Sequence, residues 1–265
     1  MKKGILLAVI AVFSTVGLAQ AEEGQLSGRF DVTYLSTYVW RGFDMYPNNH
    51  GAIQGKLDVD FFGTGFGIGL LWSGALATGF GNSEELDLTL SYGQSLFENE
   101  AYATNYKLGW VYYDLPDQRP TLGHMQELFT SLSWPELCPF GVVPSYTIAL
   151  MWPSASGSTV GVNGGWFHIL GLGYDWTVPG LVPETPEQIL HLSAELVYND
   201  GAAPGPRGAV AVDHDWSHFV LGVSTEFGLT ENLAFTPGLY YQRSMDKSVN
   251  TQDEWWVSLG LSYKF

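Results

Sequence analysis

Two groups of residues combine the side chains found in catalytic or metal-binding sites. The first is His191, Ser193 and Glu195, which alternate along one segment and share a face if that segment is a β-strand. A base, a hydroxyl and an acid are the components of a serine hydrolase, but members of such a triad usually come from different segments of the chain. We therefore predict no catalytic residue here.

The second group is Asp213, His214, Asp215 and His218, two carboxylates and two imidazoles close together in the sequence. Such side chains could bind a divalent metal or form an exposed protease-like site. They fall, however, in a polar stretch, residues 199–216, that reads as a long loop, and at the start of the strand that follows it, where solvated polar side chains are ordinary. The sequence thus predicts neither a metal nor a cofactor.

A larger set of charged residues occupies alternate positions in segments whose other positions are apolar. If these segments are strands of a membrane barrel, the charges must point inward, because Arg or Lys facing lipid at the midplane costs about 2–4 kcal/mol. The charges then either pair in a salt-bridged plug or line a water-filled path. The predicted lumen-lining residues are Arg29, Asp31, Arg41, Lys56, Asp58, Asp60, Asp87, Lys107, Glu127, Glu195, Glu226 and Lys264, with the aromatic residues Trp72, Tyr113, Tyr240 and Trp256 on the same side.

The segments that would position these residues are short and alternate with a period of two, as half-buried strands do. About twelve segments have the length that a tilted membrane strand requires. Pro237 lies inside one of them and cannot donate to the ladder. A bulge there would preserve the count; otherwise the number of strands differs by two. The segments cover residues 26–41, 53–61, 66–74, 86–92, 106–112, 128–134, 146–152, 166–176, 190–199, 219–227, 233–241 and 255–265.

The connections between segments alternate between short and long, which is the rule for outer-membrane barrels with long outer loops and short periplasmic turns. Aromatic residues near the strand ends form two expected girdles. The outer one contains Trp40, Tyr112, Trp152, Tyr198 and Tyr241, and the periplasmic one contains Phe61, Tyr92, Trp134, Phe227 and Phe265. A soluble sandwich, the alternative interpretation of these strands, gives no reason for that arrangement.

The last segment places Trp255, Val257, Leu259, Leu261 and Tyr263 on one apolar face and ends at Phe265. It resembles the closing strand of bacterial outer-membrane barrels, whose terminal Phe and preceding aromatic residue are recognised by the barrel-assembly machinery. That resemblance implies that Tyr263 and Phe265 form an assembly signal.

The amino terminus has the features of a cleaved signal peptide. Lys2 and Lys3 precede an apolar stretch, residues 4–18, which is shorter than the roughly 20 residues of a spanning helix. The small residues Ala19 and Ala21 then provide a cleavage site. We therefore divide the chain into a signal peptide, residues 1–21, and one outer-membrane β-barrel, residues 22–265.

Composition agrees with an exported all-β protein. Hydrophobic residues make up 46% and charged residues only 14%, with 32 glycines for tight turns. Cys138 is the only cysteine, so it forms no internal disulfide, and no activating partner is evident for it. The net charge of −16 becomes −18 once the two signal-peptide lysines are removed, which argues against nucleic acid as a partner. An acidic exterior suits outer-membrane lipid and lipopolysaccharide bridged by divalent ions.

Residues 34–43 carry a recognisable pattern: an aromatic residue, Tyr38, then two residues, then Arg41 and Gly42. Gln54 and Gly55 follow after a variable stretch. This pattern resembles the opening of the TorF-type porin family, also known as the Gcw conserved-hypothetical group of exported bacterial proteins. The resemblance covers about the first 75 residues. It implies a pore whose substrate is largely undefined.

These observations together predict a transmembrane antiparallel up-and-down β-barrel that is not an enzyme. Its expected function is the passive diffusion of small hydrophilic solutes, with a mild preference for cations. Two alternatives remain open: an outer-membrane barrel enzyme that hydrolyses lipid or peptide, and a non-conducting structural barrel. The sequence indicates neither the solute nor the oligomeric state.

Overall fold

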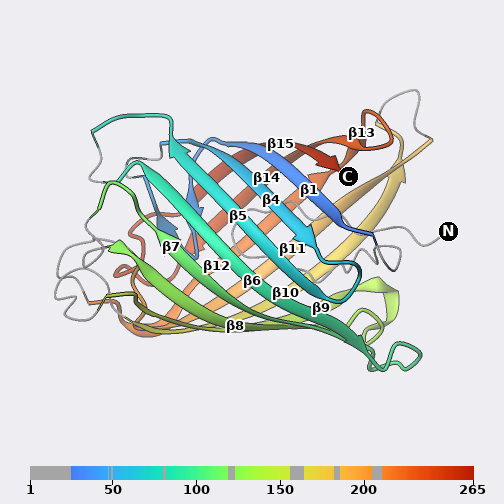
Figure 1. The fold of residues 1–265 in the computed structure, drawn as a ribbon, viewed down its shortest axis with the longest axis horizontal. Coiled ribbons are helices and arrows are strands. Elements are labelled where there is room, and N and C mark those ends of the chain that lie inside the picture. Colours follow the sequence, from blue (N-terminus) through green and yellow to red (C-terminus); the bar gives the residue numbers. More distant parts are fainter. Residues whose placement is uncertain are drawn as a thin grey trace.

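Twelve antiparallel strands close into a barrel in the computed structural model (Figure 1). The structure describes residues 25–46, 48, 50–79, 82–118, 123–155, 164–181, 186–204 and 211–265; the expected signal peptide, residues 1–21, lies outside them. Each long strand pairs with its neighbours in sequence, and the first pairs with the last through Arg29–Lys264 to Leu35–Ser258. The predicted fold class and strand count are confirmed. Within the described part of the chain, no helix is long and apolar enough to cross a membrane.

The strands of the barrel have the following bounds. They are β1 Ser27–Leu35, β4 Ala52–Asp60, β5 Phe66–Ala75, β6 Glu84–Leu96, β7 Thr104–Asp114, β8 Met125–Ser133, β9 Val143–Pro153, β10 Gly165–Pro179, β11 Glu187–Asp200, β12 His214–Thr225 with its continuation β13 Phe227–Gly228, β14 Leu233–Ser244 and β15 Glu254–Lys264. Two further short strands, β2 Val39–Trp40 and β3 Phe43–Asp44, form a separate hairpin, and a 3₁₀ turn, η1, covers Pro139–Gly141.

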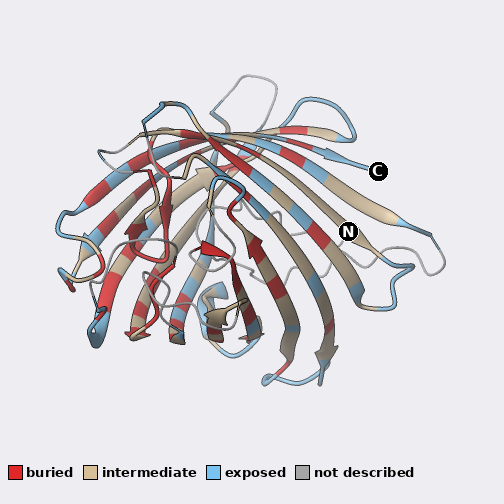
Figure 2. Ribbon diagram, turned by 60° about the vertical axis from the view of Figure 1, so that its left-hand side comes forward, coloured by how far each residue is buried: buried red, intermediate tan, exposed pale blue. Residues whose placement is uncertain are grey.

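The two faces of the sheet differ in polarity, as the period of two predicts. Phe30, Leu57 and Leu70 lie side by side on the outer face of β1, β4 and β5. Their neighbours Asp31 and Lys56 lie side by side on the inner face. Figure 2 shows the result as bands of different burial that alternate along the strands. A continuous apolar outer face around a polar interior is what a lipid-embedded barrel requires.

The two ends of the barrel also differ. The start of β1 and the C-terminus lie at one end, here called the terminal end (Figure 1). The connections there are short, at residues 61–65, 97–103, 134–142, 180–186 and 229–232, whereas the opposite loop end carries longer connections at residues 36–51, 76–83, 115–124, 154–164, 201–213 and 245–253. This is the predicted alternation of long and short connections, except that the connection at residues 134–142 is as long as that at 245–253 and longer than that at 76–83.

Pro237 does not cause the bulge that the sequence suggested. It pairs in register with Leu259 of β15, and on its other side the pairing continues in one register from Ser224–Gly238 to Phe227–Phe235. The ladder is interrupted there and resumes, because proline has no N–H to donate. The irregularity in this region of the sheet lies instead at Val197/Tyr198, opposite β12.

Two aromatic residues lie on faces other than those predicted. Trp40 was expected in the outer girdle, but β1 ends at Leu35 and Trp40 is buried in the β2–β3 hairpin. Trp72 was expected in the lumen, but it lies beside Gly55 and Leu86 on the outer face and is 43% exposed. Alternation in the glycine-rich β5 is weak, which is why parity misplaced Trp72.

Candidate functional site

The connection between β1 and β4 turns into the barrel and forms the β2–β3 hairpin near the loop end (Figure 1, short blue arrows). Arg41 and Gly42 occupy its tip with φ angles of 44° and 92°. Two successive positive φ angles define the tight turn that matches the twist of a two-residue hairpin. Val39, Phe43 and Leu35 are fully buried, so the hairpin packs into the interior rather than extending outward.

Arg41 makes the most specific contact of the hairpin with the barrel wall. Its Nη1 and Nη2 donate to Oε2 and Oε1 of Glu127 on β8 at 2.5 and 2.8 Å, a bidentate ion pair. Tyr113 of β7 donates its hydroxyl to the same carboxylate at 3.2 Å. The guanidinium carbon also lies 4.7 Å from the ring centres of Trp40 and Phe167, which is cation–π distance.

Other contacts hold the hairpin against further strands of the wall. The Tyr38 hydroxyl donates to Glu85 Oε2 on β6 at 2.9 Å, and Gln242 Nε2 of β14 donates to the Gly42 carbonyl at 3.0 Å. Burial, reinforced by the charges of Glu85 and Asp87, raises the pKa of the Tyr38 hydroxyl, which therefore stays a neutral donor. Contacts with β6, β8 and β14 show that the hairpin spans the lumen near the loop end.

Gly42 is required at the hairpin tip for two reasons. Its φ of 92° is unfavourable for any side chain, and an added Cβ would lie 2.5 Å from His218 Nδ1 and 2.9 Å from Val249 Cγ1. The tip therefore fits closely against β12 and the connection between β14 and β15.

The barrel wall around Arg41 contains more carboxyl groups than the one guanidinium group of the hairpin can form ion pairs with. Glu85, Glu127 and Glu195 are each at most 3% exposed, and Asp87 lies on the same inner face of β6 as Glu85. Neither carboxylate oxygen of Glu195 has a hydrogen-bond partner among the described residues, and His218 Nε2 is 4.0 Å from Oε1. Buried charges without partners are costly, so an uncompensated carboxylate of this kind calls for an explanation.

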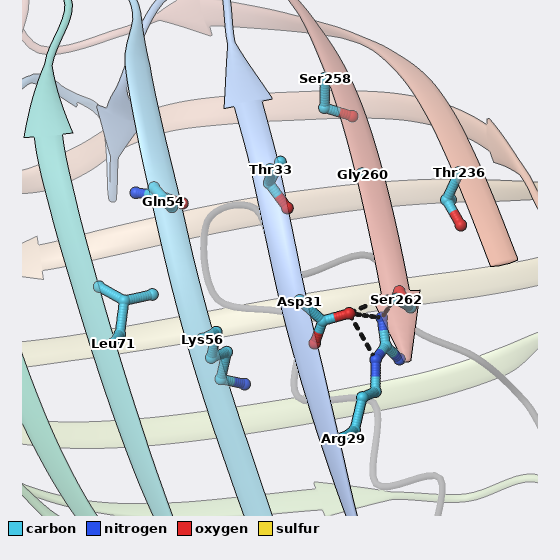
Figure 3. Close-up of a pocket in the computed structure, with 10 residues that line it drawn as sticks. All are labelled: Arg29, Asp31, Thr33, Gln54, Lys56, Leu71, Thr236, Ser258, Gly260 and Ser262. Atoms are coloured by element: carbon cyan, nitrogen blue, oxygen red, sulfur yellow. Dashed lines mark hydrogen bonds and ion pairs between the residues drawn. The ribbon is translucent and has the colours of Figure 1, made fainter. Parts of the chain in front are cut away.

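A second polar group lies on the inner face closer to the terminal end (Figure 3). Arg29 donates to Asp31 Oδ1 at 2.6 Å and to Ser262 Oγ at 2.8 Å, and Lys56 Nζ lies 2.7 Å from Asp58 Oδ2. A small cavity of about 20 Å³ adjoins this group, and its further lining residues are Thr33, Gln54, Leu71, Thr236, Ser258 and Gly260. Most of these side chains can hydrogen-bond to a hydrophilic solute or to water.

The structure divides the predicted lumen-lining residues into these two groups and places a few elsewhere. Arg41, Asp87, Glu127 and Glu195 lie near the hairpin; Arg29, Asp31, Lys56, Asp58, Lys107 and Lys264 lie toward the terminal end. Asp60 is at the rim, where its Oδ1 accepts a hydrogen bond from the Gly63 N–H at 2.8 Å. Glu226 lies between β12 and β13, beside the interruption at Pro237.

Sequence reasoning missed Glu85, Gln242 and the inward course of the hairpin. Glu85 has the same parity as Asp87, so the alternation of β6 could have identified it. Gln242 could be found only with the hairpin in place, because its amide contacts a backbone carbonyl 200 positions away in sequence.

The residues considered for catalysis do not assemble into a site. His191 Nδ1 lies 2.7 Å from Asp175 Oδ1 on β10, its partner in the ladder, rather than from Ser193. His214 pairs with Asp200, whereas His218 is buried beside Ser217. Among the described residues, no group of three or more His, Cys, Asp or Glu side chains could hold a metal ion.

Comparisons with known proteins agree on the fold. No family model and no curated protein matches the chain. Among solved structures, the KdgM porin is similar with a TM-score of 0.52 at 10% identity, over 89% of this chain and 99% of that one. The NanC porin gives 0.51 at 11%, over 91% and 100%, and an outer-membrane channel from Pseudomonas putida F1 gives 0.55 at 9%, over 94% and 98%.

These similarities show a shared fold: the chain has the architecture of outer-membrane β-barrels of the porin and channel type. At about 10% identity they carry no information about substrates. The function must therefore be argued from the lumen itself.

Proposed function

We propose that this protein is an outer-membrane channel for the passive diffusion of small hydrophilic solutes. The observation that carries the proposal is the polarity of the closed sheet: large apolar side chains such as Phe30, Leu70 and Leu261 are exposed outside, while charged and hydroxyl side chains line the interior. A polar interior within a lipid-compatible wall gives hydrophilic solutes a path that the bilayer denies them.

The β2–β3 hairpin crosses the lumen and contacts β6, β8 and β14, and we propose that it forms a constriction that prefers cations. Asp87, Glu127 and Glu195 on the wall oppose the single guanidinium of Arg41. Negative charge that is focused in a low-dielectric passage raises the local concentration of cations.

The same proposal implies where the protein is located and how it is oriented in the membrane. The apolar outer face contacts outer-membrane lipid and lipopolysaccharide, residues 1–21 direct export, and the terminal end faces the periplasm. The main chain of Phe265 exchanges hydrogen bonds of 2.9 and 3.0 Å with Gly28 where the first and last strands meet. This position at the closure of the barrel supports the role in assembly that we propose for Phe265. The pattern around Arg41 and Gly42 favours membership of the TorF-type porin family, and we propose no catalytic role.

Planar-bilayer recordings of the refolded protein test this function. We expect stepwise conductance, with a reversal potential in a KCl gradient that reports cation preference. Glu195→Gln and Asp87→Asn should reduce that preference, whereas Glu231→Gln, on an exposed turn outside the lumen, should leave it unchanged. A folded barrel that never conducts would instead be a structural protein.

A further inference from the structure

A cationic group of the chain itself occupies a site that the barrel wall forms. The guanidinium of Arg41 is bound in its plane by the Glu127 carboxylate and covered on its face by Phe167. Tyr113 orients the carboxylate through its hydroxyl. A bidentate carboxylate combined with an aromatic face is the arrangement that recognises guanidinium groups.

The same site contains a second buried carboxyl group that Arg41 does not hydrogen-bond. Glu195 on β11 interacts electrostatically with Arg41, yet among the described residues neither of its carboxyl oxygens has a hydrogen-bond donor, and the residue is only 2% exposed. A second buried carboxylate beside the guanidinium gives the wall a greater affinity for cations than one arginine requires.

The hairpin that supplies Arg41 can leave without opening the barrel. Its two strands pair only with each other, through Val39–Asp44 and Trp40–Phe43, and not with the main sheet. Its hydrogen bonds with the wall include those of the Tyr38 and Arg41 side chains and one to the Gly42 carbonyl. Glu127, Tyr113, Phe167 and Glu195 all belong to wall strands and would remain.

We propose that these four wall residues form a binding site for solutes that carry a guanidinium group, and that Arg41 fills this site when no such solute is present. Entry of the solute displaces Arg41 and with it the hairpin. This inference rests on the proposed channel function, because the solute reaches the site through the lumen, and it names the chemical class that the constriction selects.

Arg41→Gly is the variant that tests the site. It removes the guanidinium and introduces the residue that a positive φ favours, so the turn is retained. The probe is methylguanidinium chloride, with methylurea as a neutral analogue of the same shape and NaCl as a control for ionic strength. The readout is the temperature at which the folded barrel loses its heat-modifiable gel migration.

We expect methylguanidinium, but neither methylurea nor NaCl, to raise the unfolding temperature of the Arg41→Gly protein, since a ligand that binds only the folded state stabilises it. Wild type, whose site is filled, should not respond at the same concentrations. Adding Glu127→Gln should weaken the apparent affinity by about tenfold or more, because hydrogen bonds to a charged group become neutral ones.

If Arg41→Gly alone does not fold, methylguanidinium in the refolding mixture should restore folding. If methylguanidinium neither stabilises the variant nor rescues its folding, the proposed site is refuted. It is also refuted if methylurea has an equal effect. The measurement needs no bilayer, so it separates the two proposals. Binding without conductance would refute the channel function and support the guanidinium site. Conductance without binding would support the channel function and refute the site.

Discussion

Substitution of Glu195 should change the stability of the protein little when Glu127 is present and much more when Glu127 is replaced. In wild type, Arg41 already has a bidentate partner, and Glu195 is a buried carboxyl group without a hydrogen bond to any described residue. Glu195→Gln removes the cost of burying a carboxylate, but it also removes the favourable interaction of that carboxylate with Arg41. The two effects oppose each other, so we expect a change of at most about 1 kcal/mol in the free energy of unfolding. Glu127→Gln alone should cost about 1–2 kcal/mol, because charged hydrogen bonds become neutral ones and Glu195 remains as the counter-charge.

With both carboxylates replaced, the guanidinium of Arg41 loses its bidentate partner Glu127 and the electrostatic support of Glu195. Breaking a buried ion pair in this way costs about 3–5 kcal/mol, so Glu195→Gln should be far more destabilising in the Glu127→Gln background than in wild type. Alternatively the hairpin moves out to hydrate the guanidinium, which would appear as increased conductance.

Urea unfolding of the four proteins, followed by tryptophan fluorescence in vesicles, measures this coupling. Glu231→Gln, in an exposed turn, is the control and should change stability by no more than about 0.5 kcal/mol. If the changes in the free energy of unfolding of the two single variants add to that of the double variant within about 0.5 kcal/mol, and conductance is unchanged, then Glu127 and Glu195 do not both stabilise Arg41. The reasoning would then be wrong.

Three further outcomes follow from other parts of the barrel. Gly42→Ala should destabilise the protein more than Gly141→Ala in urea unfolding: both positions have positive φ, which costs about 1–2 kcal/mol, but only Gly42 has neighbours where a Cβ would lie. Deletion of Phe265 should lower the amount of protein in the outer-membrane fraction, whereas Phe140→Ser, at an exposed site in the η1 turn, should not; normal insertion of the truncated chain would contradict an assembly role. In a cysteine-free background, a thiol at Leu192 should be protected by lipid from a water-soluble reagent while one at Ser193 reacts, and equal labelling would exclude a membrane barrel.

The fold could be predicted from the sequence because a membrane barrel imposes one simple rule on every strand. Apolar positions face lipid and polar ones face the lumen, so alternation identifies each strand and its orientation independently of the others. The rule weakens where a face consists of glycine, and there it misplaced Trp72. It also could not decide whether Pro237 causes a bulge or merely a missing hydrogen bond, since both leave the same pattern of side chains.

The hairpin was missed for a different physical reason. Tyr34, Tyr38 and Trp40 continue the spacing of β1, so alternation extends the strand into residues that leave the wall. The signal against extension is Leu35, an apolar residue at a lumen position, which is fully buried under the hairpin. Alternation describes a two-sided wall and carries no information about a segment that is enclosed on all sides.

The backbone at Arg41 provides an independent reason to regard the hairpin tip as functional. A φ of 44° is unfavourable for a long side chain, and Asn, Asp or Gly would form the same turn with less strain. An arginine at this position therefore reduces the intrinsic stability of the turn, and only the contacts of its side chain compensate. Those contacts, the bidentate pair with Glu127 and the face of Phe167, are the ones that a guanidinium-bearing solute would replace. Displacement of Arg41 would also release the strained turn from the wall, so the interaction that the solute competes for helps to hold the hairpin in the lumen, together with the contacts of Tyr38 with Glu85 and of Gly42 with Gln242.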